Sequence, residues 1–186
     1  MLVSDDPRVA LAVRAADCVP LLLADPRTGA VAAVHAGWRG TAAGAATAAV
    51  DALQRELGAE PSGLVAAIGP SIGPCCYEVG PELVDAFAAA GHPPHLIDRW
   101  FLAPPPRRGA RPAPGSAGAP ALRLDLWGAT RDLLMLAGLA AQHVHTCALC
   151  TASHVDLFPS YRVERDGAGR MAGAIRARRP STSDVR

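Results

Sequence analysis

The sequence predicts a mixed α/β protein in which helices are layered on β-sheet. Two kinds of segment alternate along the chain: short apolar runs bounded by turn residues, which are typical of strands, and alanine-rich segments with apolar residues at helical spacing. The chain has no glycine-rich phosphate-binding fingerprint of a doubly wound nucleotide fold. With 186 residues, it fits one domain with its own core.

The clearest local pattern is a β-hairpin that carries a cysteine and a histidine. Residues 19–24 and 30–34 are apolar runs, and the segment 25–29 between them has turn chemistry. Cys18 opens the first strand and His35 closes the second. In an antiparallel pair these two ends lie side by side, so the two side chains are expected to share one metal ion.

Thiolate and imidazole are donors that zinc and copper both bind, and zinc is the expected ion. A catalytic zinc usually takes three protein ligands, so a third donor must come from elsewhere. Taken alone, one Cys and one His at strand ends are more often structural. The flanking residues favour a functional site, because Asp17 precedes the cysteine and Arg39 lies in the turn 37–40, where glycines allow close backbone approach and a guanidinium can grip phosphate or carboxylate.

Other strands and helices follow from the same patterns. Thr41 is expected to cap an alanine-rich helix over residues 41–57, which Gly58 ends. The start of that helix would lie beside Arg39 and favour a bound anion. Further strands are predicted at residues 9–13, 64–68, 144–149 and 173–176, and further helices at residues 81–90 and 126–137.

The five cysteines favour thiols and metal ligands over disulfides, since their number is odd and no export signal is present. Cys75 and Cys76 are adjacent, and we expect their side chains to diverge, with one packed and the other facing a pocket. A zinc-like spacing also occurs later, at His143, His145, Cys147 and Cys150. Alternation along a strand would place Cys150 on the opposite face from the rest, which argues against one shared ion.

Composition excludes several classes of function. Half of the residues are hydrophobic, 19% are charged and the net charge is +1, so a soluble globular protein is expected, with no attraction to nucleic acid or membrane. No apolar run approaches the roughly 18 residues of a membrane span, and no signal peptide is recognisable, which predicts a cytoplasmic protein. Residues 103–121 should form a flexible Pro/Gly/Arg insertion, and residues 179–186 a disordered tail.

Several longer motifs point to a known family. They are ADCVPLLLADP, AVHAGWRG, AIGPSIGPCCYEVG, LDLWGATRDLL, CTASHVDLFPSYR and GRMAGAI, and together they span most of residues 4–178. In this order they resemble the YfiH-like or multicopper polyphenol oxidase (laccase) family, whose members act on purine nucleosides. The resemblance implies a four-layer α/β/β/α sandwich. It also implies a single domain over residues 1–178 that lacks the N-terminal portion of the family pattern.

The resemblance also implies a site. The family holds zinc with two histidines and a cysteine, and Cys18 and His35 fall on two of those positions; the third ligand is a histidine expected upstream of Met1. The implied partners are phosphate and a purine nucleoside: inosine, guanosine, adenosine or 5′-methylthioadenosine, with deamination of adenosine as a second activity. Arg39 would orient phosphate, and Asp17 would either support the metal ligands from behind or act as a general base. The substrate-binding residues would be Arg39, Cys75, Tyr77 and Arg162.

Three alternatives remain open beside the zinc-dependent purine nucleoside phosphorylase. A copper-dependent polyphenol oxidase would need several histidine-rich copper centres, which the six histidines of this chain do not supply. A catalytically incomplete fragment would follow from the missing third ligand. A cell-wall precursor editing factor is a neighbouring role within the family. For the oligomeric state of the protein, a monomer is favoured.

Overall fold

The computed structural model describes residues 1–102 and 122–178. The predicted flexible insertion, residues 103–121, and the predicted tail, residues 179–186, lie outside the described residues. Within the described part, no helix is long and apolar enough to cross a membrane.

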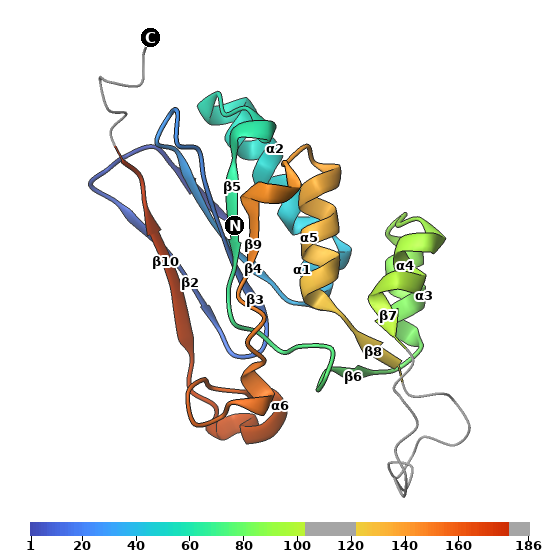
Figure 1. The fold of residues 1–186 in the computed structure, drawn as a ribbon. Helices are drawn as coiled ribbons and strands as arrows, with labels where there is room; N and C mark the ends of the chain where they lie inside the picture. The colour runs from blue at the N-terminus through green and yellow to red at the C-terminus, as the bar shows by residue number, and fades with distance from the viewer. Residues whose placement is uncertain (103–121, 179–186) are drawn as a thin grey trace, which may run out of the picture.

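A five-stranded sheet in the order β1-β4-β3-β5-β9 forms the centre of the molecule (Figure 1). Its strands are β1 (Leu2–Ser4), β3 (Val19–Ala24), β4 (Val31–Ala36), β5 (Val65–Ile68) and β9 (Val144–Thr146). Only β5 and β9 pair in parallel; the other pairs are antiparallel. The predicted hairpin of β3 and β4 is confirmed, and Pro20 lies opposite His35 in its register.

A second β layer covers one face of this sheet. Strands β2 (Ala10–Ala15) and β10 (Met171–Arg176) form an antiparallel ribbon that joins the two ends of the described chain. Along β2 buried and exposed residues alternate, as expected for a strand with one packed face. Leu11 and Val13 point inward and pack against the central sheet.

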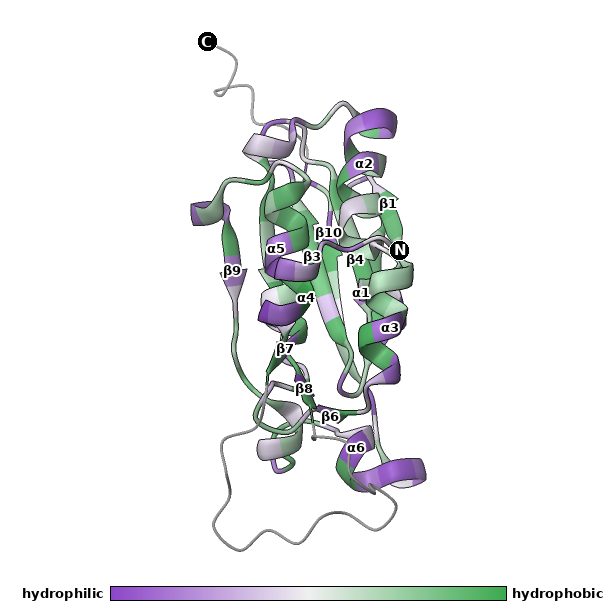
Figure 2. Ribbon diagram, turned by 90° about the vertical axis from the view of Figure 1, so that its right-hand side faces the viewer, coloured by the Kyte–Doolittle hydropathy of each residue, from purple (hydrophilic) through white to green (hydrophobic). Residues whose placement is uncertain are grey.

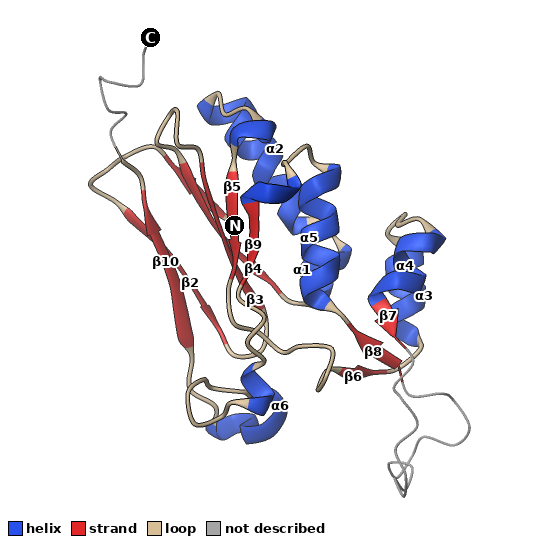
Figure 3. Cartoon of the chain, viewed as in Figure 1, coloured by secondary structure: helices blue, strands red, loops and turns tan. Residues whose placement is uncertain are grey.

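Helices cover the opposite face of the central sheet (Figure 3). The main ones are α2 (Ala45–Leu57) and α5 (Leu126–Leu136), and the short α1 (Trp38–Ala42) follows β4 directly. Figure 2 shows apolar residues concentrated on the strands of the central sheet, and α2 and α5 contribute buried apolar residues to the same core. The ribbon, the sheet and these helices form successive layers of a mixed α+β fold. The full four-layer arrangement stays a prediction.

The predicted single helix over residues 41–57 is wrong, because two helices occupy this region. Gly44 adopts a left-handed conformation with φ of 72° and separates α1 from α2. Thr41 is therefore not a helix cap: it is buried inside α1, whose N-cap is Gly37. Helical spacing alone does not reveal this break, because the larger apolar residues that show the spacing, Val50, Leu53 and Leu57, all lie after Gly44.

A small outer unit lies beyond α1 and α5 in Figure 1. It contains α3 (Glu82–Ala89), α4 (Pro94–Trp100), and a three-stranded sheet of β6 (Glu78–Val79), β8 (Leu122–Leu124) and β7 (Phe101–Leu102). Edge-to-face contacts of Phe87 with Trp100 and Phe101 form its core. The Trp100 indole donates a 2.9 Å hydrogen bond to Asp132 of α5, which fastens this unit to the main layers.

Candidate metal and substrate site

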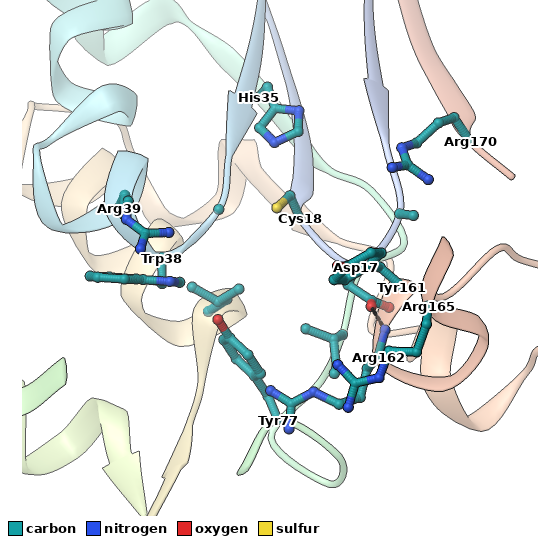
Figure 4. Close-up of a pocket in the computed structure, with 14 residues that line it drawn as sticks. Asp17, Cys18, His35, Trp38, Arg39, Tyr77, Tyr161, Arg162, Arg165 and Arg170 are labelled. Atoms are coloured by element: carbon teal, nitrogen blue, oxygen red, sulfur yellow. Dashed lines mark hydrogen bonds between the residues drawn. The ribbon is translucent and has the colours of Figure 1, made fainter. Parts of the chain in front are cut away.

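A cavity of about 470 Å³ opens at the end of the β3–β4 hairpin. Its volume is in the usual range for small-molecule sites, about 300–1,000 Å³. All predicted site residues except Cys75 line it, namely Asp17, Cys18, His35, Arg39, Tyr77 and Arg162. Figure 4 shows that they reach the cavity from separate parts of the chain.

Cys18 and His35 enter the cavity from neighbouring ends of the hairpin (Figure 4). The His35 Nδ1 lies 2.8 Å from the backbone carbonyl of Arg14, so Nδ1 donates a hydrogen bond and Nε2 is left with its lone pair. Metal-ligating histidines commonly have such a carbonyl partner. Burial, together with the charge of Asp17, raises the pKa of the Cys18 thiol, although Arg170 opposes the shift.

Gly37 keeps the space around the thiol open. A Cβ at this position would lie 2.6 Å from the Cys18 sulfur, so a side chain here would displace the thiol. The turn after His35 therefore needs glycine for a steric reason, which agrees with the close approach expected from the sequence.

The donors fit two of the three ligands of a catalytic zinc. In residues 1–102 and 122–178, only one group of three or more potential metal ligands is present, and it consists of Cys75, Cys76 and Cys150. No third protein donor thus joins Cys18 and His35 in the part of the chain that the structure describes. Both residues are donors that zinc binds, and the Arg14 carbonyl orients the His35 ring for a ligand at Nε2.

Asp17 is buried and both of its carboxylate oxygens accept hydrogen bonds. One oxygen accepts from the hydroxyls of Thr151 and Ser160 at 2.6 and 2.8 Å, and the other accepts from the backbone N–H of Arg162 at 2.6 Å. The backbone of Asp17 is in the left-handed region, with φ of 79°. Asp17 thus holds the segment after Cys150 against the start of the hairpin.

Four arginines surround the cavity: Arg39, Arg162, Arg165 and Arg170. The ion pairs among the described residues involve other arginines, so none of these four is neutralised by a carboxylate there. Among the described residues that line the cavity, Asp17 is the only acidic one, and its oxygens are already engaged. The cavity is therefore suited to an anionic ligand.

Aromatic rings hold two of these guanidinium groups. The guanidinium carbon of Arg39 lies 4.3 Å from the ring centroid of Trp38, and that of Arg162 lies 5.2 Å from the ring centroid of Tyr77. Burial, with the nearby thiol of Cys18, raises the pKa of Tyr77 to about 12. The phenol is therefore neutral at physiological pH and can donate a hydrogen bond to a ligand.

The sequence did not identify every residue of the cavity. Arg165 and Arg170 line it because helix α6 (Tyr161–Glu164) and the following turn fold back toward the hairpin. The only signal for Arg170 is its place in the GRMAGAI motif. Arg165 has φ of 53°, a backbone conformation that its sequence context does not reveal.

Cys75 does not line this cavity, and its predicted divergence from Cys76 is wrong. Both sulfurs approach the Ser153 hydroxyl, at 3.5 and 3.3 Å. Residues 73–77 form a tight turn, with the N–H of Tyr77 bonded to the carbonyl of Gly73, so adjacent side chains do not alternate as in a strand. The two thiols consequently face the same partner.

The predicted strand over residues 144–149 is also shorter than expected. Strand β9 ends at Thr146, and Ala148, with φ of 55°, turns the chain. Among the described residues, His143, His145 and Cys147 lie in no group of potential metal ligands with Cys150. The predicted alternation does not apply to Cys150, because it lies beyond the turn at Ala148.

Comparison with known proteins agrees with the motifs. The model of the family described as multi-copper polyphenol oxidoreductase laccase matches residues 1–178. The chain belongs to this family.

Two relatives illustrate the names that the family carries. The purine nucleoside phosphorylase YlmD of Geobacillus stearothermophilus is 38% identical over 174 residues, which cover 94% of this chain and 58% of the relative. The adenosine deaminase RL5 of an unknown prokaryotic organism is 35% identical and covers 90% of this chain and 58% of its own length. The chain thus spans less than two thirds of the length of each of these two relatives.

A solved structure in the same family has the same fold. The crystal structure of a hypothetical protein YfiH from Bacillus licheniformis superposes with a TM-score of 0.80 at 35% identity. The alignment covers 95% of this chain and 60% of that one. The mixed α+β arrangement described above is therefore that of YfiH-type proteins.

Proposed function

We propose that this chain carries the metal- and phosphate-binding part of a zinc-dependent purine nucleoside phosphorylase. The observation that carries the proposal is a single cavity that brings together a thiol, an imidazole, four arginines and aromatic side chains. Relatives named purine nucleoside phosphorylase, including YlmD, support the same activity.

Phosphate is the anion that the arginines suit best. Arg39 sits on the Trp38 ring, which fixes its planar guanidinium for bidentate contact with phosphate oxygens. Arg162 is held by Tyr77 and donates a 2.9 Å hydrogen bond to the Glu78 carbonyl, so its remaining donors are available to a ligand. The purine nucleoside would place its base against the aromatic side chains, since base–aromatic stacking contributes about 1–3 kcal/mol per base.

The proposed reaction forms one bond and breaks another at the ribose. A phosphate oxygen bonds to C1′, and the bond between C1′ and N9 of the purine breaks. The purine leaves with the bonding electrons and gains a proton, so the products are ribose 1-phosphate and the free base. The arginines would lower the cost of bringing the phosphate charge to the ribose.

Cys18 and His35 would hold the zinc, which supplies Lewis-acid polarisation of an oxygen atom when it is bound. We propose that a third ligand comes from outside the described residues, and the family pattern expects a histidine for that role. Asp17 would act as a positioning residue, because both of its oxygens already hold the neighbouring segment. A carboxylate whose oxygens are all occupied by these hydrogen bonds is better suited to hold the site in place than to act as a general base.

Adenosine deamination is a second candidate, supported by the relative named adenosine deaminase. Water would replace the 6-amino group and release ammonia, in the same cavity.

The copper-dependent polyphenol oxidase is less well supported, since Cys18 and His35 provide donors for one ion and not for several copper centres. The enzyme would act in the cytoplasm, where nucleosides and phosphate are both present.

The test is phosphate-dependent turnover of nucleosides. Purified protein is incubated with inosine, guanosine, adenosine or 5′-methylthioadenosine, with and without phosphate, and ribose 1-phosphate, free base and ammonia are measured. Phosphate-dependent release of base supports phosphorolysis, and ammonia without phosphate supports deamination. Phenol oxidation with a copper content of several ions per chain would contradict the proposal. A zinc-loaded protein that turns over none of these substrates would point to the fragment or to a cell-wall precursor role.

A further inference from the structure

Three cysteine thiols meet outside the cavity described above. Cys75 and Cys76 lie in the turn after β5, and Cys150 lies more than 70 positions later, after β9. Their sulfur atoms all lie within 4.8 Å of one another. Cys150 is 3% exposed, whereas Cys75 is exposed, so the group extends from the core to the surface.

The backbone around these thiols is held by several hydrogen bonds. The N–H of Ser71 donates to the Leu149 carbonyl at 3.2 Å, and the N–H of Thr151 donates to the Ser71 carbonyl at 3.1 Å. The N–H of Gly73 donates to the Cys150 sulfur at 3.3 Å. The two segments therefore form a short ladder that fixes the thiols before any ion is bound.

Trp127 supports the same turn from the side of α5. Its indole donates a 2.7 Å hydrogen bond to the Ser71 hydroxyl. A Cβ on Gly73 would lie 2.4 Å from the Trp127 ring, so this position needs glycine to pack against the indole. The geometry of the cysteine cluster is thus set by neighbouring contacts and not by the cysteines alone.

The sulfur spacing suits a metal ion. Around a tetrahedral zinc with Zn–S bonds of about 2.3 Å, sulfur atoms are separated by roughly 3.8 Å, so a contraction of about 1 Å is enough to bind. Three thiolates are soft donors, which select Zn²⁺ or Cu⁺ over harder ions. A disulfide would use only two of the three thiols, and adjacent cysteines such as Cys75 and Cys76 seldom meet its geometry.

We propose that Cys75, Cys76 and Cys150 bind one thiophilic metal ion, Zn²⁺ or Cu⁺, with the fourth position open to solvent beside Ser153. This site is distinct from Cys18 and His35 and does not depend on the proposed function. The ion ties the turn that carries Tyr77 to the segment whose Thr151 bonds to Asp17. Its role is to hold one wall of the cavity in place.

The test is metal titration of the whole chain with reduced thiols under anaerobic conditions. Cd²⁺ serves as the probe, because its bonds to thiolates give an ultraviolet charge-transfer band that needs no enzyme activity. The titration uses a Cys18→Ser background, which removes the thiolate of the other site. The expected result is one Cd²⁺ per chain with the band intensity of three thiolates, and displacement by Zn²⁺ or Cu⁺ then assigns the ion by its relative affinity.

Matched variants locate the site. In the same background, Cys150→Ser should weaken Cd²⁺ binding at least about 10-fold, as expected for loss of a direct ligand. Cys147→Ser is the control, because Cys147 is exposed and lies outside the cluster. Circular dichroism checks folding, and the exposed Cys75→Ser replaces Cys150→Ser if the buried substitution prevents folding.

Three results would overturn the proposal. One is a Cys18→Ser protein without a thiolate band at micromolar Cd²⁺. Another is equal binding by Cys150→Ser or Cys75→Ser and the Cys147→Ser control. The third is a disulfide between Cys150 and Cys75 or Cys76 in protein isolated without reductant. If mass spectrometry finds this bond and it resists reduction in the presence of Zn²⁺, the cluster is a structural disulfide and not a metal site.

Discussion

The cavity at Cys18 and His35 and the cluster of Cys75, Cys76 and Cys150 are two sulfur-containing sites with opposite surroundings. The cavity offers two protein donors within a ring of arginines and aromatic residues, and leaves room for substrate. The cluster offers three identical soft donors on two segments that backbone hydrogen bonds join, with Cys75 exposed and Cys150 buried. If the two proposals hold, open coordination positions and nearby charges separate a reactive site from a stabilising one, whereas the ligand types alone do not.

The largest expected effects come from substituting one residue of each site and comparing the losses of turnover and of stability. His35→Ala should lower phosphorolysis at least about 100-fold while changing the melting temperature little, because His35 is exposed and its loss removes a direct ligand. Cys150→Ser should lower the melting temperature of the metal-loaded protein and change turnover less. Calorimetry and the inosine assay measure both. If both substitutions affected stability and turnover in the same proportion, the comparison would fail.

Asp17→Asn tests the link between the two regions. An amide in place of the carboxylate cannot accept all three hydrogen bonds, and a buried donor or acceptor left unpaired costs about 1–3 kcal/mol. The melting temperature should fall by about 2–4 °C for each kcal/mol in a domain of this size. Asp51→Asn, on the exposed side of α2, is the control. A stable Asp17→Asn protein with a large loss of turnover would instead support the general-base role.

Arg39→Lys tests whether the Arg39 guanidinium binds phosphate in the cavity. Lysine keeps the charge but loses the planar stack on Trp38 and the two-point grip on phosphate, so the phosphate KM should rise about 10-fold at nearly unchanged stability. Arg55→Lys, on the distant helix α2, is the matched control. An unchanged KM with a lower melting temperature would show that Arg39 only supports the turn.

The smallest effect concerns the space beside the Cys18 thiol. Gly37→Ala places a Cβ 2.6 Å from the sulfur and should weaken zinc binding about 10-fold. The thiol would be displaced but not removed, so the loss should resemble that of a residue that orients a ligand. Gly63→Ala meets no atom within 4 Å and should leave zinc binding unchanged. Zinc content after dialysis against a weak chelator distinguishes them. Equal zinc retention by both variants would show that the thiol has room to move.

The sequence predicted the local parts of this molecule better than its long-range parts. The hairpin follows from apolar runs and turn residues within about 20 positions, so Cys18 and His35 were placed correctly. The pairing of β2 with β10 joins opposite ends of the chain, and no local pattern encodes it. The break at Gly44 and the shared direction of Cys75 and Cys76 depend on single backbone angles and turns, which residue spacing does not report.

The central claim is that the cavity at Cys18 and His35 binds the metal and phosphate of a nucleoside phosphorylase. The most direct test compares this chain with its Cys18→Ser and Cys147→Ser variants for phosphate-dependent release of ribose 1-phosphate from inosine and for bound zinc. We expect equal turnover in the unsubstituted chain and Cys147→Ser, and a loss of at least about 100-fold in Cys18→Ser together with its zinc. Equal turnover in all three proteins would contradict it.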